Sequence, residues 1–486
     1  MQARDTAESG DLRRNLKSRH LSMIAIGGSI GTGLFVASGA TIAQAGPGGA
    51  LVAYALIGLM VYFLMTSLGE LAAFMPVSGS FATYGSHFVD PAFGFAQGWN
   101  YWYNWAITVA VELAAATIVM KFWFPDTPGY LWSALFLSII FGLNYFSVKG
   151  FGEAEFWCSL IKVVTVLVFI VIGLMMVFGI MHGSVQPDWS NLHTGDAPFV
   201  GGIPTVISVA MIAGFSFQGT ELIGVAAGES ADPGKNIPRA VRQVFWRIML
   251  FYVFAIAIIG VLLPYSDPLL LKNDITDVGA SPFTLVFERA GLAFAATLMN
   301  AVILSAIISA GNSGMYASTR MLYTMARTGM APKLFAKLSD NGVPRNALYA
   351  TTLIAMLCFL TSLFGDQMVY LWLMSASGLS GFIAWLGIAV SHYRFRRGYL
   401  HQGHDLKDLP YTAYFFPFGP LLAFALCLLI TLGQGYEGLQ AATIDWQSVM
   451  AAYIGIPLFL VLWLGYKIKY KTRVVPLAEM TFPHRD

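Results

Sequence analysis

The chain has 486 residues, of which 57% are hydrophobic and only 11% charged, and its formal net charge is +2. Soluble domains carry about 25% charged residues, so this composition excludes an ordinary water-soluble protein. Its mean hydropathy is +0.65. We see no clustered basic face and expect no nucleic-acid partner. The three cysteines lie far apart in apolar segments and predict neither disulfides nor a metal site, and we expect no cofactor.

Apolar stretches long enough to cross a bilayer recur along the whole chain. A helix needs about 20 apolar residues to span the hydrocarbon core, and these stretches are continuously apolar rather than alternating. The sequence therefore predicts an all-α polytopic membrane protein with about twelve transmembrane helices and no cleaved signal peptide. We place the spans near 21–44, 48–75, 92–121, 130–147, 155–181, 200–228, 241–264, 290–322, 346–364, 368–393, 411–433 and 447–467.

The basic residues indicate on which side of the membrane the termini lie. An even number of spans puts both termini on one side. If that side is the cytoplasm, 24 of the 28 Lys and Arg residues fall in cytoplasmic segments, three fall in outer loops, and Lys162 lies within a span. Basic residues concentrate in cytoplasmic loops. We therefore expect a cytoplasmic tail at each end, residues 1–19 and residues 468–486.

The first predicted span contains a segment that is a poor helix. Gly27-Gly28-Ser29-Ile30-Gly31-Thr32-Gly33 has four glycines in seven residues, and each glycine costs about 1 kcal/mol of helix propensity relative to alanine. An unwound segment is tolerated in a membrane only where it lines a cavity, and the N–H groups that begin the next half-helix suit a carboxylate. The segment also matches the G-x-S-x-G hydrolase pattern, but without a strand-to-helix turn we expect no enzyme.

A second weak segment, Gly214-Phe215-Ser216-Phe217-Gln218-Gly219-Thr220-Glu221, lies near the centre of the sixth span. One break near the start of each five-helix half is typical of inverted-repeat transporters, which bind substrate at the midplane between the breaks. Close helix packing through small residues is the alternative for either motif alone. The matching positions of the two motifs favour the transporter.

Three ionisable residues, Glu112, Lys162 and Glu221, fall well within predicted spans. A charge at the membrane centre costs roughly 2.5–3.5 kcal/mol on insertion scales, so function is the default expectation. The alternative is a structural ion pair or a side chain that reaches the interface. We hypothesise that Lys162 contacts the unwound part of span one, as a sodium ion would, and changes protonation during transport. Either acid then accepts the proton or pairs with a cationic substrate.

Aromatic residues crowd the third span, and some of them belong to the interfacial belt. Tyr101 and Trp105 are four residues apart and share a helix face. The same pair is placed to form a wall of the substrate pocket, and the sequence leaves both interpretations open.

Seven segments carry a family resemblance: 27–35, 100–105, 215–221, 229–233, 236–240, 311–320 and 381–387. They resemble the amino-acid transporter branch of the amino acid–polyamine–organocation superfamily, and most closely its bacterial lysine-specific permeases. The resemblance runs from about residue 11 to beyond residue 470. It implies a LeuT-like fold, with a core of two inverted repeats of five helices (20–393), helices 1 and 6 unwound, and two additional helices (394–467).

The resemblance also implies proton-coupled import, or symport, of L-lysine across the bacterial inner membrane. It places the substrate carboxylate on the first break and the α-amino group on carbonyls of both breaks, and it puts Lys162 at the sodium-mimicking position. The implied substrate-binding residues are Ile26, Ser29, Ile30, Gly31, Thr32, Gly33, Tyr101, Trp105, Thr108, Phe215, Ser216, Phe217, Glu221 and Ser313, and the proton-coupling residues are Lys162, Glu112 and Glu221.

Several alternatives stay open at this level. Relatives that carry neutral amino acids bear similar acids, so Glu112 and Glu221 alone do not establish a cationic cargo. The first alternative is therefore a permease for another amino acid such as arginine or histidine. An uncoupled channel and a lysine-sensing membrane receptor are further alternatives, and nothing in the sequence indicates a protein partner.

Overall fold

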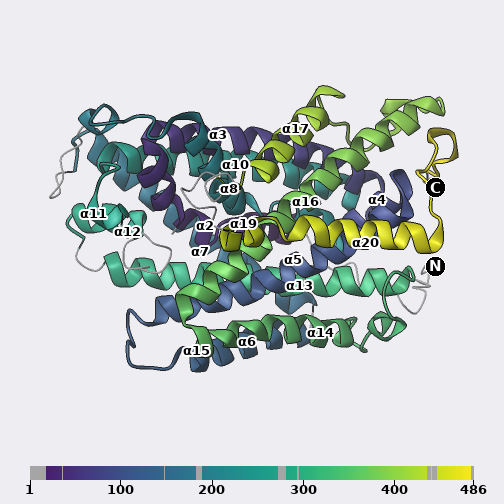
Figure 1. Ribbon diagram of the computed structural model, residues 1–486, viewed down its shortest axis with the longest axis horizontal. Helices are drawn as coiled ribbons and strands as arrows, with labels where there is room; N and C mark the ends of the chain where they lie inside the picture. Colours follow the sequence, from purple (N-terminus) through teal and green to yellow (C-terminus); the bar gives the residue numbers. More distant parts are fainter. Residues whose placement is uncertain are drawn as a thin grey trace, which may run out of the picture.

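The structure is a computed structural model that describes residues 18–35, 37–146, 148–181, 189–271, 281–292, 295–434, 439 and 446–482, and every regular element in this part of the chain is a helix (Figure 1). Within these described ranges, eight helical stretches are long and apolar enough to cross a membrane. The predicted all-α membrane protein is confirmed for these residues. The count of twelve crossings stays a prediction.

Each predicted span overlaps at least one helix of the described residues, in the predicted order. They are α1 (Ser18–Ser29), α2 (Thr32–Phe35), α3 (Ala37–Phe74), α4 (Ser80–Phe88), α5 (Pro91–Met120), α6 (Gly129–Phe146), α7 (Val148–Val177), α8 (Gly202–Phe217), α9 (Leu222–Ala226), α10 (Pro233–Leu262), α11 (Pro268–Leu271), α12 (Pro282–Arg289), α13 (Ala295–Arg327), α14 (Arg345–Ala355), α15 (Thr361–Phe364), α16 (Asp366–His401), α17 (Phe418–Gly433), α19 (Trp446–Tyr453) and α20 (Gly455–Tyr470). Short 3₁₀ helices include η1 (Trp189–Leu192), η2 (Ala227–Glu229), η4 (Lys333–Ala336), η5 (Met356–Leu360), η6 (Leu406–Asp408) and η7 (Leu477–Glu479).

A sharp turn inside α3 separates the first two predicted spans. Gly46 has φ +74°, a conformation that favours glycine, and Pro47 follows it. A Cβ at Gly46 would lie 2.7 Å from the carbonyl oxygen of Pro198. The first span is therefore built from α1, α2 and the short part of α3 before this turn.

The core of the bundle forms around α5, which packs against α13 and α16, while α3 packs against α8 and α10. The most apolar part of α5 is almost wholly buried by other helices, whereas only about a third or less of the corresponding parts of α6, α7 and the stretch 345–364 is buried. Helices α6 and α14 lie side by side at one edge of the bundle (Figure 1). Their exposed apolar side chains are those expected of a surface in contact with lipid.

Three short helices, α4, α11 and α12, lie between predicted spans and were not predicted. All three are too short to cross a membrane, so hydropathy over a 20-residue window does not detect them. Helix α7 also begins seven residues before the predicted start of span five. Because of this earlier start, Glu155 lies two turns inside α7 and is fully buried.

Candidate functional site

Both glycine-rich segments interrupt a helix. Helix α1 ends at Ser29 and α2 begins at Thr32, while α8 ends at Phe217 and α9 begins at Leu222. In the second interruption Gly219 has φ +103°, which favours glycine. Its N–H donates a hydrogen bond of 3.0 Å to Glu221 Oε2.

Beside the two interruptions, the start of α2 contacts the end of α8 at Gly33 and Ser216. A Cβ built on Gly33 would lie 2.6 Å from the Cα of Ser216 and 2.7 Å from its Oγ. Such distances cannot be relieved by rotating a side chain, because one of the atoms belongs to the backbone. Glycine at position 33 is therefore what lets the start of the second half-helix approach the end of α8.

A tyrosine hydroxyl joins the ends of the two interrupted helices. Tyr252, from α10, places its hydroxyl 2.9 Å from the carbonyl oxygen of Ser29 and 2.6 Å from that of Ser216. Its single proton bonds one carbonyl at a time. The ring packs edge to face on Phe217, with centroids 4.5 Å apart. Freed carbonyl groups at helix ends need such donors inside a membrane protein.

Replacing Tyr252 with phenylalanine is expected to destabilise this junction. The ring contacts remain, but the carbonyl oxygens of Ser29 and Ser216 lose the hydroxyl that they share. Loss of a donor to a buried acceptor costs about 1–3 kcal/mol. We expect a lower thermal unfolding midpoint of the purified protein and slower transport. Tyr62→Phe, which alters a half-buried tyrosine on α3, is the matched control. An unchanged unfolding midpoint for Tyr252→Phe would show that this hydroxyl is not needed there.

A small cavity of about 20 Å³ lies where the interruptions meet. Six of its lining residues are predicted substrate-binding residues, one is the predicted coupling residue Glu112, and two were not selected. The lining residues are Ser29, Gly31, Gly33, Trp105, Thr108, Glu112, Phe215, Gln218 and Ala310. This volume is enough for one water molecule but not for an amino acid.

Other predicted site residues lie next to the cavity without lining it. Ile30 and Phe217 are buried, and Ser216 lies against Gly33 as described. Ser313 lies on α13 with the groups around Glu155. The side chains of Ile26 and Thr32 lie outside the described residues.

The carboxylate of Glu221 is held by neighbouring helices. It accepts hydrogen bonds from the Tyr101 hydroxyl, at 3.3 Å, and from Trp385 Nε1, at 3.2 Å. Tyr101 also contacts Trp105 edge to face, with centroids 6.3 Å apart. The predicted Tyr101–Trp105 pair therefore lies together, with Trp105 at the cavity and Tyr101 bonded to the acid behind it.

Lys162 lies on α7 with its side chain fully buried. Two carboxylates act on it electrostatically, those of Glu155 and Glu112. Glu112 Oε1 lies 3.8 Å from the position that a Cβ of Gly31 would occupy. Of the two acids predicted for proton coupling, Glu112 is thus the one that faces both the first interruption and Lys162.

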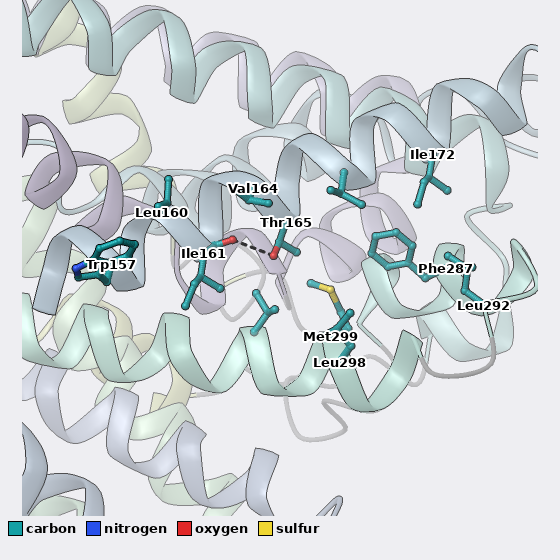
Figure 2. A pocket seen from close by; sticks show the side chains of 12 residues that line it. Trp157, Leu160, Ile161, Val164, Thr165, Ile172, Phe287, Leu292, Leu298 and Met299 are labelled. Carbon is teal, nitrogen blue, oxygen red and sulfur yellow. Dashed lines mark hydrogen bonds between the residues drawn. The ribbon is translucent and has the colours of Figure 1, made fainter.

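A second and much larger cavity, of about 690 Å³, is an apolar groove between α7 and the segment 287–302 (Figure 2). Figure 2 shows Ile161 and Trp157 from α7 and Met299 from α13 among its lining residues. Its one hydroxyl, on Thr165, donates to the carbonyl of Ile161 in its own helix. The groove offers no charged group to an amino acid, so it is not the substrate site.

Four residues of the site were missed in the sequence. Gln218 reaches across to α16 and donates to the carbonyl of Gly378 at 3.0 Å. Ala310 and Tyr252 come from helices with no unusual composition, so no sequence signal identifies them. Glu155 was placed at the end of a span, and the two-turn spacing from Lys162 on one helix face was the signal that could have found it.

Comparison with known proteins agrees with this architecture. Residues 20–478 match the amino acid permease family. The chain is 70% identical to the lysine-specific permease LysP of Escherichia coli strain K12, covering 99% of this chain and 98% of that protein. It is 54% identical to LysP of Lactococcus lactis (98% and 94% covered) and 52% identical to the histidine permease HisP of the same species (96% and 98% covered). The chain is a multi-pass membrane protein and belongs to the amino acid permease family.

Proposed function

We propose that the protein imports L-lysine together with protons, as a secondary active transporter. The observation that carries this proposal is the contact between Gly33 and Ser216, which brings two interrupted helices together around one polar cavity. Interrupted helices that meet at a midplane site are typical of secondary transporters. Family membership and the 70% identity to a lysine-specific permease support the choice of cargo.

The backbone of the amino acid binds between the two interruptions. N–H groups at the start of the second half-helix, residues 31–33, donate hydrogen bonds to the carboxylate. Carbonyls at the ends of α1 and α8 accept hydrogen bonds from the α-amino group. The side chain extends past Trp105 and Thr108. Because the cavity of about 20 Å³ is too small for an amino acid, substrate entry requires the interrupted helices to separate.

Lys162 couples this site to the proton gradient. Its side chain is fully buried on α7 and interacts electrostatically with two carboxylates, those of Glu155 and Glu112. Loss of its proton in one conformation, and its return in the other, ties substrate release to proton movement. The proposal also includes a ten-helix inverted-repeat core with two extra helices, a location in the bacterial inner membrane and cytoplasmic termini. The strong positive-inside bias supports this orientation of the termini.

Competition in proteoliposomes tests the cargo. Labelled lysine uptake by the purified protein should be inhibited by unlabelled lysine about tenfold more strongly than by arginine or histidine, a difference of about 1.4 kcal/mol in binding. Inhibition by histidine is the most informative comparison, because the chain is 52% identical to a histidine permease. Equal inhibition by histidine would reassign the cargo.

Collapse of the proton gradient tests the coupling. Vesicles with an inward gradient should accumulate lysine above the outside concentration, and a protonophore should abolish accumulation while leaving exchange of inside for outside lysine. Accumulation that survives the protonophore would remove protons from the mechanism. Binding of lysine with no uptake at all would favour a receptor.

A further inference from the structure

A polar cluster inside the bundle surrounds Glu155, the acid that the proposed function does not use. Glu155 is fully buried on α7. Its Oε1 accepts a hydrogen bond of 2.6 Å from Ser309 Oγ on α13, and its Oε2 accepts one of 3.4 Å from Asn312 Nδ2. Asn312 Oδ1 in turn accepts from Asn144 Nδ2 of α6 at 2.8 Å. Three helices therefore converge on one carboxylate.

The cluster extends along α7 to Lys162. Ser159 lies between the two charged residues, and its hydroxyl is 3.3 Å from Glu155 Oε1 and 2.9 Å from the carbonyl oxygen of Met23 in α1. Glu155 and Lys162 are seven residues, about 10.5 Å of helix axis, apart. Helical side chains lean toward the N-terminus of their helix, so the long Lys162 side chain extends toward Ser159 and Glu155.

The opposite face of α7 is apolar and faces outward. Trp157, Ile161 and Val164 are 60%, 46% and 48% exposed and line the apolar groove of Figure 2. Burying a carboxylate and an ammonium on the inner face of such a helix costs several kcal/mol per ion. A helix that only had to pack would carry apolar residues on both faces. The inner face of α7 therefore carries charge for a purpose other than packing.

We propose that Glu155 is the proton acceptor for Lys162 and carries the proton toward the end of the bundle where α1 and α7 begin. The proton leaves the Nζ ammonium and binds a Glu155 carboxylate oxygen, so that a neutral amine and a neutral acid replace an ammonium and a carboxylate. No net charge is created in the membrane. The inference rests on the proposed proton symport and adds the residue that receives the proton.

Among the described residues, three ionisable groups lie where α1 and α7 begin, and Glu153 Oε1 is 2.5 Å from Arg19 Nη2 and 3.2 Å from His20 Nε2 there. Cys158 lies on α7 and Glu112 on α5, and both act electrostatically on Lys162. The neighbours that α13 and α6 contribute, Ser309, Asn312 and Asn144, are neutral, as is the Met23 carbonyl of α1. Glu112 faces the substrate cavity, so the two carboxylates flank Lys162 on its substrate side and on the side of the helix start.

The decisive experiment compares net transport with exchange in proteoliposomes. Glu155→Gln keeps the shape and hydrogen-bonding capacity of the side chain but cannot carry a proton. Proton-driven lysine accumulation should fall at least about tenfold, while lysine–lysine exchange, which needs no net proton movement, stays within about twofold of wild type. Glu155→Asp should restore accumulation. Glu288→Gln, which changes an exposed acid on α12, is the matched control.

Each result of this comparison either supports or overturns the role of Glu155 as proton acceptor. Accumulation at the wild-type level in Glu155→Gln, or parallel loss of accumulation and exchange, would overturn the proposal, since the second result indicates a structural role. If Glu155→Gln cannot be reconstituted, Ser309→Ala keeps the carboxylate and removes its 2.6 Å hydrogen bond. That variant should move the pH midpoint of accumulation by about half a unit or more, and an unmoved midpoint would overturn the proposal. Wild-type vesicles that accumulate no lysine would refute proton symport itself.

Discussion

Gly33→Ala is expected to abolish transport. The added Cβ would lie 2.6 Å from the Cα of Ser216, well inside van der Waals contact, so the two interruptions would have to move apart. Overpacking of this kind costs about 1–3 kcal/mol, and here the displacement falls on the backbone that binds the substrate. We expect lysine uptake to fall by at least about a hundredfold, as happens when positioning groups shift by an ångström, with smaller loss of expression.

Two other glycines serve as controls for this variant. Gly142→Ala places a Cβ in ordinary contact with Phe146 on α6 and should leave uptake unchanged. Gly31→Ala has room for its Cβ, 3.7 Å from Ala310 and 3.8 Å from Glu112, but it intrudes on the cavity and should weaken lysine binding without preventing folding. Wild-type uptake by Gly33→Ala would show that the contact with Ser216 is not part of the working transporter.

The helix interruptions could be predicted because they depend on local composition. Four glycines within seven residues weaken a helix whatever surrounds it, and the segment 214–221 contains two more. Which glycine is crowded could not be predicted, because the crowding at Gly33 comes from Ser216, about 180 residues further along the chain. The structure places this steric constraint at Gly33 and leaves room for a Cβ at Gly31.

Charged residues were harder to place than helices. Hydropathy marks where a span becomes apolar, so Glu155 was assigned to the edge of span five, although α7 begins at Val148. Arg320 was counted with the cytoplasmic residues for the same reason, yet it lies in α13 with a side chain that is 1% exposed. Partners on other helices keep both residues buried, and a single sequence does not reveal such partners.

Arg320 forms a buried ion pair with Glu229, in the segment that follows the second interruption. Arg320 Nε donates to Glu229 Oε1 at 2.9 Å, and the Tyr316 hydroxyl donates to the same oxygen at 2.9 Å. The guanidinium carbon also lies 4.3 Å from the centroid of the Tyr316 ring. The pair therefore ties α13 to the end of the second interrupted span.

Arg320→Leu is expected to be among the most destabilising single substitutions in the bundle. It removes the cation and leaves Glu229 buried beside one hydroxyl, and breaking a buried ion pair from one side costs about 3–5 kcal/mol. The double variant Glu229→Gln with Arg320→Leu removes both charges and should regain most of this loss, because Tyr316 can still bond the amide. Thermal unfolding of Arg320→Leu, Glu229→Gln and the double variant in detergent measures the coupling. A double variant no more stable than Arg320→Leu would mean that packing of the arginine side chain, and not its charge, holds α13 to the segment at Glu229.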